Sequence, residues 1–448
     1  MPEALSSQDV VRFTRELNYG TWRFQKNWNP LHIVDAEGCY FIDAEGKRYL
    51  DFSAQLMCVN LGHKNAAVIA AIEEQARRLP YVAPGYATDV RVELSRLLLE
   101  VLPRGLTKFF FTTSGTEANE AAFKIARMYT GRSKIIARYR SYHGSTMGSI
   151  GATGDPRRWP AEPSAKGQGF IFAPEVNCYA CPIKHEYPGC NIACADYVEH
   201  MIENESDVAA VVVEPVVGTN GVLAPPPEYM PRLRRICDDH GVLLIADEVM
   251  TGWGRTGKWF AMQHWDVEPD ILVTAKGITS AYMPLGLCAT TQKIAGHFED
   301  HFFAHGHTYE AHPMTLAAGV AAIHELQRLG LVERAREMGE YLGERLKALK
   351  AKHASIGDVR GLGLFWCVEL VKNRQTKEPF NTKADKMAGK PLLVDQVAAA
   401  MMKKGVAINA WLSHFVIAPP LIIEREEIDA GVAALDEALE MADRQAIG

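Results

Sequence analysis

The stretch that decides the fold is 241–252, GVLLIADEVMTG, in which an apolar run ends on two adjacent carboxylates, Asp247 and Glu248. A continuous apolar run that opens on a glycine is typical of a strand buried on both faces of a sheet. Open α/β sheets bind ligands beyond the carboxyl ends of their strands. The acid therefore either marks the point where the strand reaches the surface or faces a ligand that carries positive charge.

Strands and helices alternate on both sides of this stretch. Apolar runs predict strands over 108–113, 134–139, 208–215, 242–247, 270–276 and 285–291. Helical spacing of apolar residues appears over 64–79, 90–102, 116–131 and 228–240. Alternation of this kind indicates an α/β fold, with a mostly parallel sheet that is covered by helices on both faces.

The two ends of the chain predict a smaller α+β domain. A hairpin is expected over 39–52, around Glu45-Gly46, and two long helices follow residue 311. Short strands near 359–371 and 405–418 and a last helix come after them. We expect three segments: an N-terminal part of the small domain over 1–62, a large domain over 63–310, and the C-terminal part of the small domain over 311–448.

The composition is that of an ordinary globular protein. The chain has 448 residues, of which 48% are hydrophobic and 23% charged, and its net charge is -6. That charge gives no electrostatic case for a nucleic-acid partner. The N-terminal MPEALSSQDV has no apolar signal-peptide core, and no apolar run approaches the length of a membrane span. We therefore predict a soluble, cytoplasmic protein.

Four of the nine cysteines gather in one short segment, NCYACPIKHEYPGCNIAC (177–194). Cys178, Cys181, Cys190 and Cys194 could bind zinc together with His185, could form disulfides, or could belong to a compact turn-rich loop. The spacer is short for a zinc ribbon. We expect a structural role for this segment and no metal at the reaction centre.

The residues that follow the predicted strands carry the chemistry. Strand 108–113 leads into Ser114, Gly115 and Thr116 at a helix N-terminus, which is either an anion site made of free backbone N–H groups or a plain N-cap. Strand 134–139 leads to Tyr142 and His143, which place an aromatic ring at a strand exit.

Three charged residues end the remaining strands: Glu214, Asp247 and Lys276. A lysine at a buried strand end is costly if left unpaired, but it can lose its proton and attack a carbonyl. A ligand with a phosphate, a flat ring, a ring nitrogen to protonate and an aldehyde would satisfy all of these groups. Pyridoxal 5′-phosphate (PLP) is such a ligand, and a buried carboxylate keeps its ring nitrogen protonated.

The sequence also resembles a known protein family. LLIADEVMTGWGRTG followed by DILVTAKGI is similar to the signature of the class III, or omega, aminotransferases of PLP fold type I. The resemblance extends to TTSGTEANEAAFKIAR, SYHGSTMG, VVVEPVVGTNGV, HGHTYEAHPMTLAAG, VRGLGLFWCVEL and IAPPLII. It covers nearly the whole chain in the family's order.

The resemblance implies roles for the matching residues. Lys276 would form the Schiff base with PLP and move the proton, and Asp247 would pair with the ring nitrogen. Val249 and Tyr142 would pack on the two faces of the ring. Ser114, Gly115, Thr116 and His143 would complete the cofactor site, with Gly115 and Thr116 at the phosphate.

Other matches concern the neighbouring subunit and the substrate. Thr308 is similar to a threonine that reaches the phosphate of the neighbouring subunit, which implies a homodimer with shared active sites, or a tetramer built from it. Glu214 resembles a glutamate near the cofactor that often pairs with a mobile arginine. Leu56 and Met57 match positions that line the substrate pocket.

The sequence departs from the family pattern at Asn409. Many relatives have an arginine there, ten residues before the proline pair that begins at Pro419, and it binds substrate carboxylates. No arginine lies between Gly405 and Pro420, so another cation would have to substitute, and His414 is a candidate. Trp411 could add apolar surface to the substrate pocket.

The resemblance implies a transaminase that works in two half-reactions, with pyruvate as the expected keto-acid acceptor. Without the arginine, the expected donors are ω-amino acids, amino sulfonates and simple amines. A PLP-dependent decarboxylase, aminomutase or racemase would use the same cofactor contacts and remains an alternative, as does a PLP-holding protein without a catalytic role.

Overall fold

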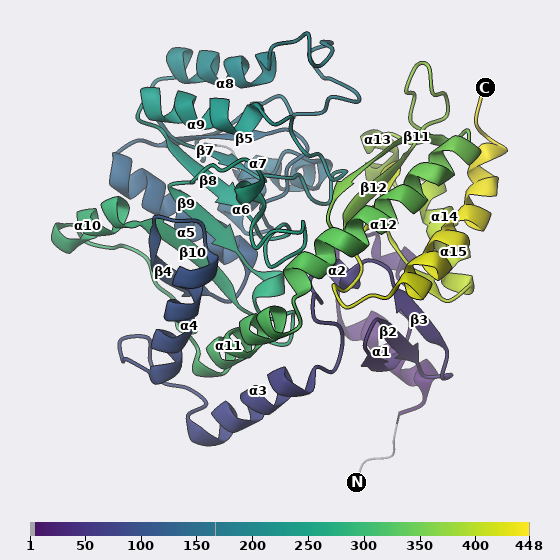
Figure 1. Cartoon of the computed structure of the whole chain (residues 1–448), viewed down its shortest axis with the longest axis horizontal. Helices are drawn as coiled ribbons and strands as arrows, with labels where there is room; N and C mark the ends of the chain where they lie inside the picture. Colours follow the sequence, from purple (N-terminus) through teal and green to yellow (C-terminus); the bar gives the residue numbers. More distant parts are fainter. Residues whose placement is uncertain (1–4, 166, 448) are drawn as a thin grey trace.

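The computed structural model describes residues 5–165 and 167–447. Figure 1 shows a large α/β unit beside a smaller unit, to which the first and the last parts of the chain both contribute. The purple N-terminal strands lie next to the green and yellow C-terminal elements in this view.

The large unit is built around a seven-stranded sheet. Its strands are β4 (Leu106–Thr112), β5 (Lys134–Arg138), β6 (Phe170–Ala173), β7 (Val208–Val213), β8 (Leu243–Asp247), β9 (Ile271–Thr274) and β10 (Gly286–Thr291). They lie in the order β4-β10-β9-β8-β7-β5-β6, and β10 runs antiparallel to both of its neighbours. The other pairings are parallel. The α/β fold with a mostly parallel sheet is therefore confirmed, while the short edge strand β6 was not predicted.

Helices cover both faces of this sheet. Along β7, Val211 and Val213 pack in a core with the helices α8 (Ala193–Asn204) and α9 (Tyr229–Asp239). Ala210 and Val212 point the other way and pack against α5 (Gly115–Thr130). Because both of its faces are covered, β7 is apolar at every position and not at alternate ones. The remaining large-unit helices are α3 (Ala66–Arg78), α4 (Asp89–Val101), α6 (Met147–Ala152), α7 (Glu162–Ala165) and α10 (Gln292–Asp300).

The small unit has two four-stranded sheets. One has the order β1-β2-β3-β13, from β1 (Ile33–Glu37), β2 (Tyr40–Asp43), β3 (Arg48–Asp51) and β13 (Val406–Ala407). The other has the order β11-β12-β15-β14, from β11 (Ile356–Leu362), β12 (Phe365–Leu370), β14 (Asn409–Trp411) and β15 (His414–Ile417). The predicted hairpin is β2–β3. The parallel pair of β13 with β3, which places Val406 opposite Leu50, joins the two ends of the chain.

Two long helices connect the units. α11 (Pro313–Arg328) packs against α3 and α4 of the large unit, whereas α12 (Leu331–Lys352) packs against β11 and α15 (Arg425–Asp443) of the small one. The other helices of the small unit and of the N-terminal segment are α1 (Ser7–Leu17), α2 (Ala54–Met57), α13 (Lys383–Met387) and α14 (Leu393–Lys403).

The structure also bears on the cysteine segment. All nine cysteines are free thiols, and Cys178 is exposed. Within residues 5–165 and 167–447, no three His, Cys, Asp or Glu side chains are grouped so that they could hold a metal ion. The zinc alternative therefore has no preformed site there. None of the described helices is long and apolar enough to cross a bilayer.

Candidate active site

The carboxyl ends of the parallel strands meet at one cavity of about 530 Å³. Asp247 is the last residue of β8, Glu214 directly follows β7, and Lys276 lies two residues beyond β9. Nine of the ten residues predicted to bind the cofactor line the cavity: Ser114, Gly115, Thr116, Tyr142, His143, Glu214, Asp247, Val249 and Lys276. The sheet topology therefore brings together residues that are up to 162 positions apart in the sequence.

Lys276 begins a single 3₁₀ turn, Lys276–Ile278, directly after the strand. Its φ of 50° lies in the left-handed region, which L residues rarely adopt and which is enriched at functional sites. Burial lowers the pKa of the Lys276 ammonium, while the carboxylates Asp247 and Glu214 act in the opposite sense. A lowered pKa leaves more of the amine unprotonated at neutral pH, which suits a nucleophile and a base.

Asp247 is buried, with 3% of its surface exposed, and its hydrogen bonds fix its orientation. Oδ2 accepts from Asn119 Nδ2 at 2.9 Å and lies 2.7 Å from His143 Nδ1. Oδ1 accepts from the backbone N–H of Val249 at 3.1 Å. Because a carboxylate only accepts, His143 carries its proton on Nδ1 when it is neutral. These three contacts fix the orientation of the buried carboxyl group.

The N-terminus of α5 also lines the cavity. Ser114 caps the helix by accepting from Glu117 N, so that Gly115 and Thr116 occupy the first turn, where backbone N–H groups have no carbonyl partner within the helix. A Cβ at Gly115 would lie 2.9 Å from both Val249 methyl groups. Thr116 Oγ1 accepts from the amides of Ser145 and Thr146 at 3.2 Å. Free amides, a hydroxyl and a helix dipole suit a phosphate.

Glu214 acts on Tyr142 through the backbone. Its two carboxylate oxygens accept from the amides of Tyr142, at 2.9 Å, and Gly218, at 2.8 Å. Burial raises the pKa of this carboxyl. Within the described chain Glu214 forms no ion pair with an arginine; it holds the loop that carries the Tyr142 ring.

The predicted substrate residues are placed differently from one another. Leu56 lines the cavity and is 67% exposed. Met57 is buried in a small apolar cluster with Met250 and does not line the cavity. Thr308 is exposed and does not line the cavity of its own chain.

Asn409 and His414 do not supply a cation. Asn409 Nδ2 donates to the carbonyl of Gln55 at 2.6 Å, and its backbone N–H donates to Ser53. His414 is 2% exposed, and burial lowers its pKa to about 4. His414 is therefore neutral at physiological pH, and its Nε2 lies 2.8 Å from the carbonyl of Thr219. Its candidacy as the substitute cation was wrong, because a buried imidazole loses its charge.

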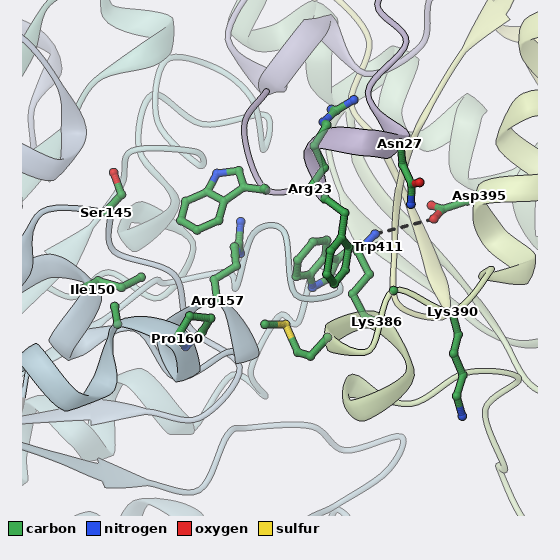
Figure 2. A pocket seen from close by; sticks show the side chains of 15 residues that line it. Arg23, Asn27, Ser145, Ile150, Arg157, Pro160, Lys386, Lys390, Asp395 and Trp411 are labelled. Carbon is green, nitrogen blue, oxygen red and sulfur yellow. Dashed lines mark ion pairs between the residues drawn. The ribbon is translucent and has the colours of Figure 1, made fainter. Parts of the chain in front are cut away.

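A cation that was not predicted from the sequence, Arg157, lies against the Tyr142 ring. It lines a second cavity, of about 640 Å³, that adjoins the first through Ser145, and Trp22 and Trp411 line it as well. In Figure 2 the Arg157 side chain extends into this space, with the Trp411 ring and Lys386 beyond it. Its guanidinium lies 3.8 Å from the centre of the Tyr142 ring and 4.7 Å from that of Trp411.

Asp155 holds Arg157 in place. The Arg157 side chain is 8% exposed and the Asp155 side chain is fully buried. Arg157 Nε donates to Asp155 Oδ2 at 2.7 Å, and Nη2 donates to the same oxygen. Within the described chain, Nη1 donates to no protein acceptor, so one edge of the guanidinium remains free beside Tyr142. Burial is the main cause of the lowered pKa of Lys276, and the charge of Arg157 also lowers it, which places both cations in one electrostatic environment.

Other residues near the site were also not predicted from the sequence. Asn119 had a detectable signal, since it is a polar residue among alanines on the buried face of a predicted helix. Arg157, Asp155 and Trp22 had none, because they lie in irregular or short segments without periodicity. Only the tertiary structure brings them to Tyr142.

Comparison with known proteins agrees with this geometry. Residues 24–439 match the family model of the class-III aminotransferases. The chain belongs to the class III aminotransferases. A taurine–pyruvate aminotransferase of Bilophila wadsworthia is 35% identical over 442 residues, which cover 92% of this chain and 93% of that protein. A leucine/methionine racemase of Thermococcus litoralis is 35% identical over 430 residues, covering 94% and 93%.

A solved structure is similar to the whole aminotransferase. The taurine:2-oxoglutarate aminotransferase from Bifidobacterium kashiwanohense, in complex with PLP and glutamate, superposes with a TM-score of 0.93. It is 36% identical, and the match covers 99% of both chains. The predicted fold type I is therefore confirmed, and PLP is the cofactor of this class III aminotransferase.

The residues of the cavity fit PLP. First-turn amides suit its phosphate, the space beside Gly115 is kept open by the missing Cβ, and a buried charged acid suits its ring nitrogen. When bound, PLP supplies an electron sink that stabilises the carbanion formed at the amine-bearing carbon. With PLP in this cavity, Lys276 would be placed to accept and return the proton, and Asp247 would be placed to keep the ring nitrogen protonated.

Proposed function

We propose that this aminotransferase moves the amino group of a donor with a distal anionic group, an ω-amino acid or an amino sulfonate, to a keto acid such as pyruvate. Simple amines are secondary donors. Lys276 takes the proton from the donor carbon in the first half-reaction and returns one to the keto-acid carbon in the second. In this proposal Arg157 determines which donors are preferred.

The position of Arg157 supports this choice. Its guanidinium lies over the Tyr142 ring and lines the second cavity, which adjoins the cofactor cavity through Ser145. A sulfonate or ω-carboxylate there would form a charge-assisted hydrogen bond with the guanidinium. Because Asp155 and the aromatic rings fix Arg157, it cannot leave when an apolar donor enters. Relatives named for taurine are consistent with such a donor.

Removing the charge of Arg157 should therefore change the donor preference. In Arg157→Met, kcat/KM for taurine and β-alanine with pyruvate should fall about 30-fold, because a hydrogen bond to a charged group is worth about 2 kcal/mol. For 1-butylamine the value should change less than about threefold, since that donor has no anion to lose. The measurement is a donor panel with steady-state kinetics at fixed pyruvate.

Arg158→Met is the matched control. Arg158 is the next residue along the chain, but its guanidinium lies over Phe172, 4.0 Å from the ring centre, and not in the cavity. The Arg158→Met variant should retain the donor preference of the unmodified enzyme. If Arg157→Met lowers all donors equally, or if glutamate surpasses taurine and β-alanine tenfold in the unmodified enzyme, the proposal fails.

We further propose that the active unit is a homodimer in which Thr308 reaches the phosphate site of the neighbouring subunit. Thr308 is exposed, and its carbonyl accepts from Tyr81 Oη at 3.0 Å. The rings of Tyr81 and Tyr309 have their centres 6.2 Å apart, and these residues are 40% and 59% exposed. Aromatic rings exposed together in this way are typical of a contact surface.

A mixture of two defective variants tests this arrangement. Thr308→Ala alone should retain PLP more weakly, and Lys276→Ala alone should be inactive. Hybrid dimers formed by mixed refolding should contain one site with Lys276 from one chain and Thr308 from the other. Such hybrids should regain about half of the native activity per dimer. No recovery in hybrids isolated with two affinity tags, or a fully active monomer in analytical ultracentrifugation, would refute the shared site.

A further inference from the structure

Asn220 lies where the ion pair of Arg157 meets Trp411. It is 2% exposed and belongs to the loop that follows β7. Its Nδ2 donates to Asp155 Oδ2 at 3.0 Å, and its Oδ1 accepts from Trp411 Nε1 at 3.1 Å. The orientation of this amide is fixed by chemistry, because an indole N–H only donates and a carboxylate only accepts.

The loop around Asn220 is itself held by the small unit. Arg360 Nε, on β11, donates to the carbonyl of Gly221 at 2.7 Å, and His414, on β15, contacts the carbonyl of Thr219. The carbonyl of Asn220 accepts from both Nε and Nη2 of Arg140. Asn220 therefore has little freedom to move, and it joins a large-unit carboxylate to a small-unit indole.

We propose that Asn220 is a positioning residue for donor selection, acting through Asp155 and Trp411 on Arg157. It holds Asp155 Oδ2 at the place where that oxygen receives Nε and Nη2 of Arg157. It also sets the plane of the Trp411 ring, which lies between the guanidinium of Arg157 and the ammonium of Lys386, at 4.7 and 5.1 Å. The inference rests on the proposed function, since it assigns a cause to the donor preference given above.

The physical reason is that Arg157 depends on one carboxylate oxygen. Asp155 Oδ2 receives both guanidinium hydrogen bonds as well as that of Asn220, while Oδ1 accepts from the backbone amide of Arg157. Without the Asn220 donor, Oδ2 loses the bond that opposes rotation of the carboxylate. A guanidinium that samples several orientations binds an anion less tightly, because binding must then order it.

The test compares Asn220→Asp with Asn220→Ala. Asn220→Asp keeps the shape and the acceptor for Trp411 but places a second acceptor against Asp155. Both variants should raise KM for taurine about tenfold, with kcat nearly unchanged, and should leave 1-butylamine within about twofold, as expected for lost binding without lost chemistry. Thermal melting of the PLP-bound enzyme checks that each variant is folded. If Asn220→Ala fails to fold, Asn220→Asp and Trp411→Phe carry the test.

A double-mutant cycle separates positioning from general structural damage. If Asn220 acts through Arg157, adding Asn220→Asp to Arg157→Met should change taurine kinetics no further. Full additivity, or an equal loss with 1-butylamine, would overturn the inference. The proposed function fails separately, if the unmodified enzyme has no preference for donors that carry an anion or if Arg157→Met leaves that preference intact.

Discussion

Lys276→Ala should lose amino-group exchange by more than about 10⁴-fold, because removal of a residue that serves as both nucleophile and proton carrier takes away two catalytic contributions. The first-turn amides of α5 and the Asp247 carboxylate remain in this variant, so PLP should still bind without a covalent bond. The measurements are single-turnover exchange between an amine and pyruvate, and PLP content after desalting.

Borohydride provides the independent readout for this variant. In the unmodified enzyme, reduction should attach the cofactor to the peptide that contains Lys276, as mass spectrometry would show. Lys403→Ala, at an exposed lysine on α14, is the control and should keep both the label and the activity. A label on any other lysine would contradict the assignment, as would substantial turnover in Lys276→Ala.

Asp247→Asn should lower kcat by about a thousandfold, which corresponds to about 4 kcal/mol in the barrier. The amide keeps the shape of the acid but not the charge that keeps the ring nitrogen protonated. In the native enzyme the carboxylate is surrounded by three N–H groups, from Asn119, His143 and Val249. The NH₂ group of the substituted asparagine would therefore face an N–H group in either orientation of the amide. Single-turnover rates, normalised to bound PLP, separate this loss from loss of cofactor.

Two controls accompany this prediction. Asp239→Asn makes the same change at an exposed site on α9 and should be neutral. Asp247→Glu keeps the charge but lengthens the side chain, and should retain more activity than Asp247→Asn if charge is the decisive property. Turnover of Asp247→Asn within tenfold of the unmodified enzyme would mean that the acid does not serve the ring nitrogen.

In the proposed donor recognition, Arg157 would differ from a mobile arginine. Asn409 faces the carbonyl of Gln55, whereas Arg157 is fixed by a buried carboxylate and stacked between aromatic rings. A fixed cation favours donors with an anion at one set distance from the amine. It disfavours bulky apolar donors, because such donors would block the hydration of Nη1 without replacing it.

The sequence by itself predicted the large sheet and the residues that meet in one cavity at the ends of its strands. Apolar runs such as 242–247 identify buried strands, because a strand covered on both faces has no polar position. The carboxyl ends of parallel strands then meet at one edge, so Asp247, Glu214 and Lys276 could be placed in a common site without coordinates. The hairpin of the small domain was also predictable from local sequence, because Glu45-Gly46 marks its turn.

Only the tertiary structure brought together the residues that we propose for donor recognition. Arg157, Asp155 and Asn220 lie outside regular strands. The contacts of Arg157 and Asn220 with Trp411 join segments about 190 to 250 residues apart. Which way a side chain points from an irregular segment depends on backbone angles that no periodic pattern encodes. The neutrality of His414 has the same origin, because its pKa is set by burial between two units and not by its neighbours in sequence.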